Sequence, residues 1–403
     1  MAKERIGILG GAFDPVHVGH IQMALSTLDA VSLDQILIMP TGNPAYKNCT
    51  ACAEDRWKMT VTACSQDPRL VPSRLELDRQ GAIYTVDTLL ALRRSHPKAE
   101  LFYIIGADVL MKLEDWHRAE EVFPLCTFLV LSRPGLTDSE DMKAEKKRLK
   151  ALGAQIRTLK ITPPVSISST ELRVSLREGL PTPELHVAVR EFCECKGLYG
   201  AQKRVENASA WVDQLFDALD AHRFAHSLSV AVTARNLARI HGLDQKKAEE
   251  AGLLHDCAKC IPLKEMRKLA ADNGLTEDET ILESGALLHS LAGAWVAEHR
   301  YQMQDPEVLE AIRYHNTGHA GMSPLAMCVC LADSIEPLRE DYPYLTEVRR
   351  LAGVSLERAL LLSLERTAEY VEARGKYLHP RTRETIAWLK TLPACASDDS
   401  LSR

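Results

Sequence analysis

The sequence lacks the features of exported, membrane-spanning and nucleic-acid-coating proteins. Its first residues, MAKERIGILGG, place charge before an apolar run that is too short and badly flanked for a signal peptide. No apolar stretch approaches the roughly 18 residues that a membrane span needs. The formal net charge of −6 gives no reason to expect binding to nucleic acid or to an anionic membrane. We therefore expect a cytoplasmic protein with no nucleic-acid partner and no membrane partner.

Disulfides, repeats and low-complexity segments are also not expected. The eleven cysteines are an odd number in a chain without an export signal, which argues against a disulfide framework. The composition is ordinary for a globular enzyme. A chain of 403 residues predicts two or three domains, each able to bury a core.

The first 200 residues alternate short, β-branched apolar runs with helical patterns. Buried strands are expected at Arg5–Leu9, Gln35–Met39, Leu101–Ile105 and Thr127–Leu131. Helices are expected between them, at Ile21–Val31, Arg56–Cys64 and Val86–Arg94. This alternation predicts an α/β domain, a doubly wound parallel sheet with its ligands at the carboxyl ends of the strands.

The strand pattern ends near Gly200, and apolar residues then recur at helical spacing. Helices are expected at Trp211–Leu219, Leu228–Ile240, Lys246–Leu254, Leu287–His299, Pro306–Tyr314 and Ser355–Ala373. The second half is therefore predicted to be an all-α bundle. We place the domain boundary near 198–204, which gives domains of residues 1–200 and 201–403.

A glycine turn follows the first predicted strand and precedes a helix. Gly10 and Gly11 let backbone N–H groups approach an anion, and the helix start adds free donors. His17 and His20 can direct imidazole donors, positive or polarised, at the same phosphate, where charge grows during nucleotidyl transfer. A second segment, Ser168-Ser169-Thr170-Glu171-Leu172-Arg173, has the residue types of a capped helix start. Its hydroxyls, free N–H groups and Arg173 predict a site for the β- and γ-phosphates.

These two strings, GGxFDPxHxGH and ISSTELR, resemble the nucleotidyltransferase superfamily marked by HxGH. Together with YTVDTL, IGAD, Trp116 and SRPG, they make residues 4–198 similar to bacterial nicotinate mononucleotide adenylyltransferases. The resemblance implies transfer of AMP from ATP to nicotinate mononucleotide, which yields deamido-NAD and pyrophosphate with the help of Mg²⁺. Phosphopantetheine adenylyltransferases, which usually carry Thr at the position of His17, are the alternative.

The resemblance also implies the ligands of each substrate. For ATP they are Gly10, Gly11, Phe13, His17, His20, Gly106, Asp108, Ser168, Ser169, Thr170 and Arg173. For nicotinate mononucleotide they are Asp14, Lys47, Tyr84, Thr85, Trp116 and Arg133. Catalysis would consist of positioning and charge neutralisation by His17, His20, Lys47, Arg173 and Mg²⁺. The family usually has Pro-Pro-His-Lys where Pro44-Ala45-Tyr46-Lys47 stands, so the lysine is kept, and a preference for nicotinate over nicotinamide mononucleotide stays open.

The second half contains six histidine and aspartate residues that are candidate metal ligands. They are His226, His255, Asp256, His289, His315 and Asp333. Imidazoles and carboxylates that project from helices are how helical proteins build metal sites. Asp256 follows an apolar helix, where an ionised carboxylate is costly to bury without a cation. Lys259 comes one turn after His255 and could bind a phosphate or orient a water molecule.

The order H…HD…H…H…D, with the strings AGLLHD, AIRYHNTG and ADSIEP, resembles HD-domain phosphohydrolases over residues 205–392. It is most similar to the bacterial symmetrical diadenosine tetraphosphatases, although Asn316 and Ser334 stand where that family commonly has Thr and Tyr. The resemblance implies cleavage of diadenosine tetraphosphate to two ADP at a dinuclear centre that is bridged by Asp256. It assigns His226, His255, Asp256 and Asp333 to one metal, and His289 and His315 to the other.

Ligation by nitrogen and oxygen suits iron or manganese, with zinc left open, and two metals would activate water and clamp the scissile phosphate. Two alternatives remain for this half: a nucleotide-sensing module without turnover, or a phosphohydrolase of another nucleotide. The sequence leaves open a homo-oligomer and any coupling between the two sites.

Overall fold

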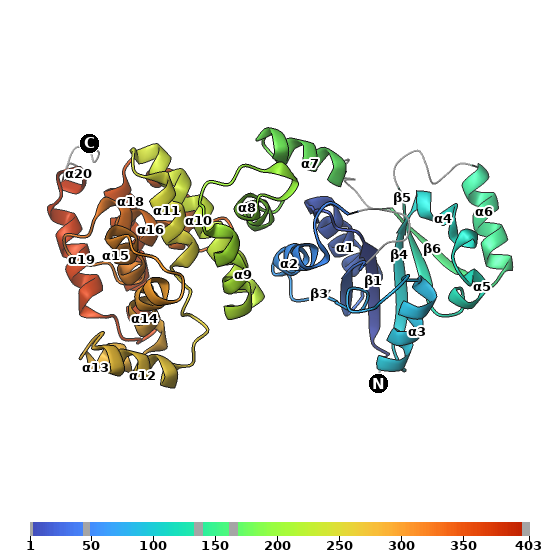
Figure 1. The fold of residues 1–403 in the computed structure, drawn as a ribbon, viewed down its shortest axis with the longest axis horizontal. Helices are drawn as coiled ribbons and strands as arrows, with labels where there is room; N and C mark the ends of the chain where they lie inside the picture. The colour runs from blue at the N-terminus through green and yellow to red at the C-terminus, as the bar shows by residue number, and fades with distance from the viewer. Residues whose placement is uncertain (1–2, 43–48, 133–139, 161–167, 397–403) are drawn as a thin grey trace. The chain divides into compact units, whose positions relative to one another are not determined.

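The computed structural model of the protein describes residues 3–42, 49–132, 140–160 and 168–396 (Figure 1). The chain divides into two compact units. One comprises Met1–Arg190 with Leu198–Gln202, and the other comprises Glu191–Gly197 with Lys203–Arg403. Within the described ranges, no helix is both long enough and apolar enough to cross a membrane.

The first unit is built on a six-stranded sheet in which every strand pair is parallel. The strands are β1 (Arg5–Gly11), β2 (Gln35–Pro40), β3 (Leu70–Pro72), β4 (Glu100–Gly106), β5 (Thr127–Ser132) and β6 (Gln155–Lys160). Their order is β3-β2-β1-β4-β5-β6, so the chain winds outward in both directions from the central pair β1 and β4. This confirms the predicted doubly wound sheet, and it places the reversal of strand order where ligands bind in such folds, at the carboxyl ends of β1 and β4.

Short helices connect the strands of this unit. They are α1 (Val18–Val31), α2 (Ala53–Cys64), α3 (Thr85–Ser95), α4 (Ala107–Leu110), η1 (Leu113–Asp115), α5 (Ala119–Val122), α6 (Glu140–Ala151), α7 (Ser169–Glu178) and η2 (Leu198–Gly200). Helix α8 (Val187–Lys196) contains the point where the chain passes from one unit to the other.

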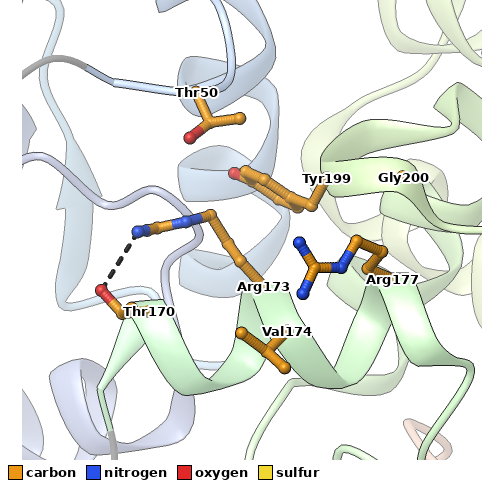
Figure 2. A pocket seen from close by; sticks show the side chains of 7 residues that line it. All are labelled: Thr50, Thr170, Arg173, Val174, Arg177, Tyr199 and Gly200. Carbon is orange, nitrogen blue, oxygen red and sulfur yellow. Dashed lines mark hydrogen bonds between the residues drawn. The ribbon is translucent and has the colours of Figure 1, made fainter.

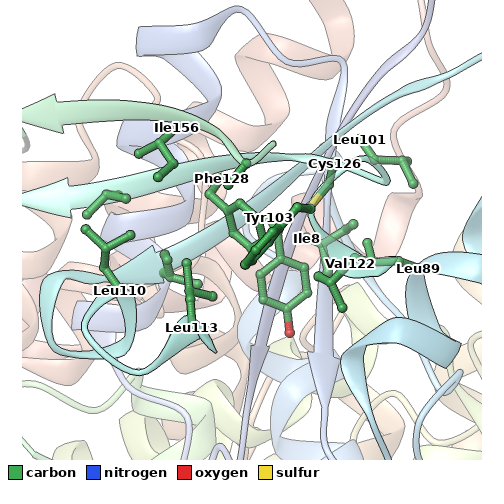
Figure 3. Close-up of a cluster of buried hydrophobic side chains, with 14 of the residues drawn as sticks. Ile8, Leu89, Leu101, Tyr103, Leu110, Leu113, Val122, Cys126, Phe128 and Ile156 are labelled. Atoms are coloured by element: carbon green, nitrogen blue, oxygen red, sulfur yellow. The ribbon is translucent and has the colours of Figure 1, made fainter. Parts of the chain in front are cut away.

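A hydrophobic core covers one face of the sheet. Alternate residues of neighbouring strands, such as Ile8, Tyr103 and Phe128, point to this face and are joined by Leu89 from α3 and Val122 from α5 (Figure 3). Ile36 and Ile38 of β2 are buried as well, and α1 and α2 pack next to this strand. Burial on both faces explains why the central strands form continuous apolar runs in the sequence.

Two strands were not predicted from the sequence, and both lie at an edge of the sheet. Strand β3 has three residues, which is too short to give a pattern. Strand β6 has the sequence QIRTLK, in which only Ile156 is fully buried. An edge strand needs few apolar residues, so it produces no apolar run.

The second unit is helical throughout its described residues, as predicted. Its helices are α9 (Ala208–Ala218), α10 (Ala221–His241), α11 (Gln245–Leu254), α12 (Leu263–Asn273), α13 (Glu279–Leu282), α14 (Gly285–His299), α15 (Pro306–Tyr314), α16 (Pro324–Ile335), α17 (Leu345–Ala352), α18 (Leu356–Ala373), α19 (Pro380–Thr391) and α20 (Pro393–Ala396). Helix α10 packs against α11 and α16, and α15 packs against α11, α14 and α16. These five helices or the residues directly after them carry all six predicted metal ligands.

Candidate active sites

The turn between β1 and α1 holds both histidines of the HxGH string. His17 is the N-cap of α1, and its backbone N–H donates to Nδ1 of His20 at 3.2 Å. The two imidazole rings lie with their centroids 3.6 Å apart. Because Nδ1 of His20 accepts a hydrogen bond, the proton of the neutral ring must sit on Nε2. The capping contact therefore makes Nε2 of His20 a donor that can serve a phosphate oxygen.

His17 is a neutral donor rather than a cation. Burial lowers its pKa to about 4, because desolvation disfavours the imidazolium form. Its side chain is buried, and Nδ1 has no hydrogen-bond partner among the described residues. A buried polar atom without a partner costs free energy, so this nitrogen is suited to binding a ligand. Of the two options in the sequence-based prediction, the polarised imidazole is the one that the structure favours.

Helix α7 brings the second predicted motif to the same turn. Ser168 caps this helix by accepting from the N–H of Glu171, whose carboxylate accepts from the N–H of Ser168 in return. Ser169 donates its hydroxyl to the carbonyl of Pro15 at 3.1 Å, and Arg173 donates to the carbonyl of Asp14 at 2.8 Å. Segments about 150 residues apart in the chain thus meet at the carboxyl end of β1.

A hollow of about 340 Å³ lies beside these contacts. Arg173 and Arg177 project into it from α7, and Thr50 and Tyr199 lie across from them (Figure 2). Arg173 also donates to the hydroxyl of Thr170 at 3.0 Å, the bond drawn in Figure 2. The sequence-based prediction included Thr170 and Arg173 but not Arg177, which repeats the positive charge one helical turn later.

Asp14 has a structural task that its sequence position did not indicate. Its carboxylate is 1% exposed and accepts from the N–H groups of Thr50 and Ala51 at 2.7 and 3.0 Å. It also accepts from the hydroxyl of Tyr199 at 2.9 Å. These bonds tie the segment before α2 and the η2 turn to the end of β1, so the carboxylate positions the site. Tyr199 lies in the LYG turn, where no residue pattern signalled this role.

The other predicted transferase residues surround the carboxyl ends of β1 and β4. Gly106 caps α4, and a Cβ on it would lie 2.5 Å from Oδ1 of Asp108, so a larger residue there would force that carboxylate to move. Tyr84 caps α3, whose first residue is Thr85, and its ring lies on that of His117 with centroids 4.1 Å apart. Trp116 packs edge-on against Tyr103 in the core.

Three further predicted ATP ligands lie at the end of β1, and two predicted residues cannot be placed. Gly10 and Gly11 end this strand, and Phe13, with a positive φ of 47°, follows it. A Cβ on Gly10 would meet the hydroxyl of Tyr103 at 3.0 Å, so this position is restricted to a small residue. Lys47 and Arg133 lie outside the described residues.

The helical unit gathers its six predicted ligands into one buried cluster, the metal-ligand cluster. Its members are His226, His255, Asp256, His289, His315 and Asp333. Nε2 of His226 lies 2.9 Å from Oδ1 of Asp333, and that same oxygen is 3.9 Å from Nε2 of His255. Oδ1 of Asp256 lies 3.2 Å from Nε2 of His289 and 3.6 Å from Nε2 of His315. Asp256 is therefore within reach of both predicted metal positions.

Hydrogen bonds behind the cluster turn its imidazole nitrogens inward. Nδ1 of His255 lies 2.7 Å from the carbonyl of Gly252, and Nδ1 of His315 lies 2.7 Å from that of Ile312. Nδ1 of His289 makes the same kind of bond to its own helix. Because a carbonyl can only accept, each Nδ1 carries the proton and each Nε2 presents a lone pair to the cluster.

These lone pairs fit a bound cation. Nε2 of His289 and Nε2 of His315 are 3.1 Å apart although neither carries a proton in this arrangement. Nε2 of His255 is buried and has no hydrogen-bond partner among the described residues. Burial lowers the pKa of His255 to about 3 and that of His289 to about 4, so both imidazoles stay neutral, the form that ligates metals. Three facing imidazoles and two carboxylates are the donor set of a divalent metal centre.

Glu336 supports this centre, although the sequence-based prediction did not include it. It lies 3.0 Å from Nδ1 of His226 and is 1% exposed, so it orients this imidazole as carboxylates behind metal ligands do. Burial alone would lower the pKa of His226, but hydrogen bonds with Asp333 and Glu336 raise it to about 9. The signal was present in the sequence, because Glu336 follows Asp333 by three residues.

Three cationic side chains stand beside the two carboxylates. Nζ of Lys259 is 2.9 Å from Nε2 of His289 and 3.4 Å from Oδ1 of Asp256. Arg223 lies 3.4 Å from Oδ2 of Asp256, and Arg339 forms an ion pair with Asp333. Burial would raise the pKa of Asp256, yet His255, the hydrogen bonds with His289 and His315, and Lys259 hold it well below its ordinary value. The cations are half-exposed at the edge of the cluster, where they can meet an anionic substrate.

Another buried group with metal-binding residue types, Glu191, Cys195 and Glu249, is already neutralised by arginine. Arg235 lies 2.9 Å from both glutamates, and Arg204 lies 3.1 Å from Glu249. Two guanidinium groups inside this cluster repel a further cation, so we assign it a structural role in the helical unit.

Removing bound metal should lower the thermal stability of the helical unit. A ligand at 100 times its dissociation constant stabilises the folded state by about 2.7 kcal/mol, which corresponds to roughly 5–10 °C for a domain of this size. We expect scanning calorimetry after treatment with a chelator and dialysis to show such a loss, and added Mn²⁺ to reverse it. A second transition, from the sheet unit, should not move. An unchanged profile in both conditions would contradict a metal centre.

Comparison with known proteins gives a family match in each half of the chain. Residues 8–175 match the Cytidylyltransferase-like family, and residues 223–338 match the HD domain family. A Corynebacterium kroppenstedtii protein named "Probable nicotinate-nucleotide adenylyltransferase" is 42% identical over 213 residues, which cover 51% of this chain and 96% of that protein. A Mycoplasma pneumoniae protein named "Probable nicotinate-nucleotide adenylyltransferase/Ap4A hydrolase" is 29% identical over 372 residues, which cover 92% of this chain and 99% of that protein.

Among solved structures, a predicted HD superfamily hydrolase involved in NAD metabolism from Clostridium acetobutylicum is 36% identical. The match covers 46% of this chain and 98% of the Clostridium chain, with a TM-score of 0.45. The identity to the Corynebacterium protein over nearly its whole length decides the family. The chain belongs to the nicotinate-nucleotide adenylyltransferase family and carries an HD domain in its second half.

Proposed function

We propose that the protein is a bifunctional enzyme whose first domain, residues 1–200, adenylylates nicotinate mononucleotide. This proposal rests on four side chains that meet at the carboxyl end of β1, those of His17, His20, Ser169 and Arg173. The names of the Corynebacterium and Mycoplasma relatives support it. A phosphate oxygen of the mononucleotide attacks the α-phosphorus of ATP, the bond from that phosphorus to the β-phosphate oxygen breaks, and pyrophosphate leaves.

The residues of this domain act by positioning and charge stabilisation. His17 and His20 donate to the α-phosphate, whose negative charge grows as the reaction proceeds. Arg173 and the start of α7 hold the β- and γ-phosphates, which become the leaving group. Mg²⁺ would supply further neutralisation and would be held by the substrate phosphates, since the carboxylate of Asp14 already accepts three hydrogen bonds.

A competition experiment tests the substrate of this domain. We expect dinucleotide formation from ATP with nicotinate mononucleotide at low concentration, and a lower kcat/KM with nicotinamide mononucleotide. Phosphopantetheine is the third substrate to compare, because the related adenylyltransferases use it. Turnover of phosphopantetheine alone would overturn the assignment.

For the second domain, residues 201–403, we propose symmetrical hydrolysis of diadenosine tetraphosphate at a dinuclear site, with iron as the native metal. The convergence of the six predicted ligands in one cluster carries this proposal. The Mycoplasma relative named an Ap4A hydrolase supports the substrate. Water attacks one of the two inner phosphorus atoms, the central P–O–P bridge breaks, and two ADP molecules leave.

The bound metals would polarise the phosphate and lower the pKa of the attacking water. Asp256 and Asp333, together with the imidazoles around them, would hold the metals, while Glu336 orients His226. Lys259, Arg223 and Arg339 would bind the polyphosphate at the edge of the cluster. A sensing module without turnover would not need every ligand, yet all six point into one cluster.

Product analysis separates the proposal from its alternatives. Metal-loaded protein incubated with diadenosine tetraphosphate should yield ADP alone. In water enriched in oxygen-18, one of each pair of ADP molecules should carry a single label. ATP with AMP, or no turnover in the presence of iron or manganese, would refute symmetrical hydrolysis.

A further inference from the structure

Arg56 is a buried cation that the transferase mechanism above does not use. It lies on the first turn of α2. Its side chain is only 1% exposed and is the largest of the fully buried side chains among the described residues. Its guanidinium donates to the carbonyls of Ala12 at 2.8 Å, Thr41 at 2.7 Å and Gly42 at 3.0 Å. All three carbonyls lie just beyond the carboxyl ends of β1 and β2.

These bonds connect the segments that follow β1 and β2, at the point where the regular pairing of the two strands ends. The last ladder contact is the bond from the N–H of Thr41 to the carbonyl of Gly11 at 2.9 Å. Beyond it the chain leaves the strand through Phe13, whose φ of 47° lies in the left-handed region that bulky residues avoid. Arg56 therefore supplies main-chain hydrogen bonds where the regular pairing has ended.

The geometry of a peptide group makes the orientation of the turn depend on Arg56. In a planar trans peptide the C=O and the following N–H point in opposite directions. With the carbonyl of Ala12 directed at Arg56, the N–H of Phe13 is directed away from it. The turn then presents backbone donors in a fixed orientation between Gly11 and His17, the segment that meets α7.

We propose that Arg56 is a positioning residue of the adenylyltransferase site, which fixes the phosphate-binding turn through the carbonyls of Ala12, Thr41 and Gly42. This proposal rests on the proposed transferase function. Arg56 does not contact the reacting atoms, and its effect on the rate is exerted through the peptide groups that it orients.

Arg93 offers a matched control in the same unit. Its guanidinium also bonds only to main-chain carbonyls in the described contacts, to Leu125 at 3.0 and 2.6 Å and to Ala99 at 2.8 Å. These carbonyls precede β4 and β5, at the amino ends of the strands, opposite to the end where the site lies. Arg93 should therefore stabilise the fold without influencing turnover.

The test compares Arg56→Lys with Arg93→Lys in the full-length protein. Lysine keeps the charge but lacks the planar fork of donors that spans these carbonyls, so both variants should melt at lower temperature. Only Arg56→Lys should lose kcat for dinucleotide formation, by about 10- to 100-fold, because small displacements of positioned groups are this costly. Its affinity for ATP, measured by calorimetry, should fall as well, and both variants should keep the hydrolase rate of the parent.

A chemical rescue protects the test against a folding defect. Arg56→Ala leaves a guanidinium-shaped space, and guanidinium ion at millimolar concentration should restore part of the lost kcat, whereas methylammonium should not. A parent-like kcat and ATP affinity in Arg56→Lys, or an equal loss of kcat in Arg93→Lys, would overturn the proposal. A parent protein that forms no dinucleotide would instead refute the proposed function, so the two failures can be told apart.

Discussion

Asp256→Asn is expected to reduce hydrolysis of diadenosine tetraphosphate roughly a thousandfold, which corresponds to about 4 kcal/mol of transition-state stabilisation. Asn keeps the shape of the side chain but loses the negative charge that would hold the proposed metals. In the structure this carboxylate lies within 3.2–3.8 Å of His289, His315 and His255, so it is an acidic group shared by these three imidazoles. We also expect metal analysis to show that the purified variant retains less metal than the parent.

Asp244→Asn is the control for this variant. Asp244 caps α11, the helix that leads to His255, and its carboxylate accepts from the N–H groups of Lys246 and Lys247. Its replacement should leave stability nearly unchanged, because Asn caps a helix about as well as Asp, and it should leave the metal content and hydrolase rate unchanged. Full hydrolase activity in Asp256→Asn would remove Asp256 from the mechanism, and a loss of transferase activity there would show that the variant is damaged more widely.

His17→Ala and His20→Ala are each expected to lower kcat of dinucleotide formation by roughly 100- to 1,000-fold. This is the usual cost of removing one hydrogen-bond donor that stabilises charge in a transition state. The double variant should lose less than the product of the two effects, because the two imidazole rings lie with their centroids 3.6 Å apart and are expected to serve the same phosphate. Steady-state kinetics with both substrates would measure these changes.

His96→Ala provides the comparison for the histidine variants. This residue follows α3 at the amino ends of the strands and contacts Glu4 at 3.5 Å, away from the β1–α1 turn. Its replacement should leave kcat within about twofold of the parent, since surface changes rarely alter a distant site. A His17 or His20 variant with a rate close to that of His96→Ala would exclude the proposed donor role.

Local patterns in the sequence were sufficient for the fold class and the two chemical centres. Continuous apolar runs such as Thr127–Leu131 predicted strands buried on both faces, and helical spacing after Gly200 predicted a bundle. Adjacent His255 and Asp256 after an apolar helix indicated a metal, because an ionised carboxylate in that setting needs a cation. The GGxFDPxHxGH string indicated a phosphate site, because its glycines, histidines and helix start lie within eleven residues of chain.

Only the tertiary structure decided which side chains support those centres. Arg56 binds main-chain carbonyls and Asp14 accepts from Tyr199, so neither contact has a local signature. Glu336 contacts His226 across 110 residues, so its spacing from Asp333 gains a meaning only in the folded chain. The tautomers of His20, His255 and His315 depend on hydrogen bonds that appear only when the backbone is folded. Motif residues are recognisable because their chemistry constrains their neighbours in the chain, whereas supporting residues are constrained only by neighbours in space.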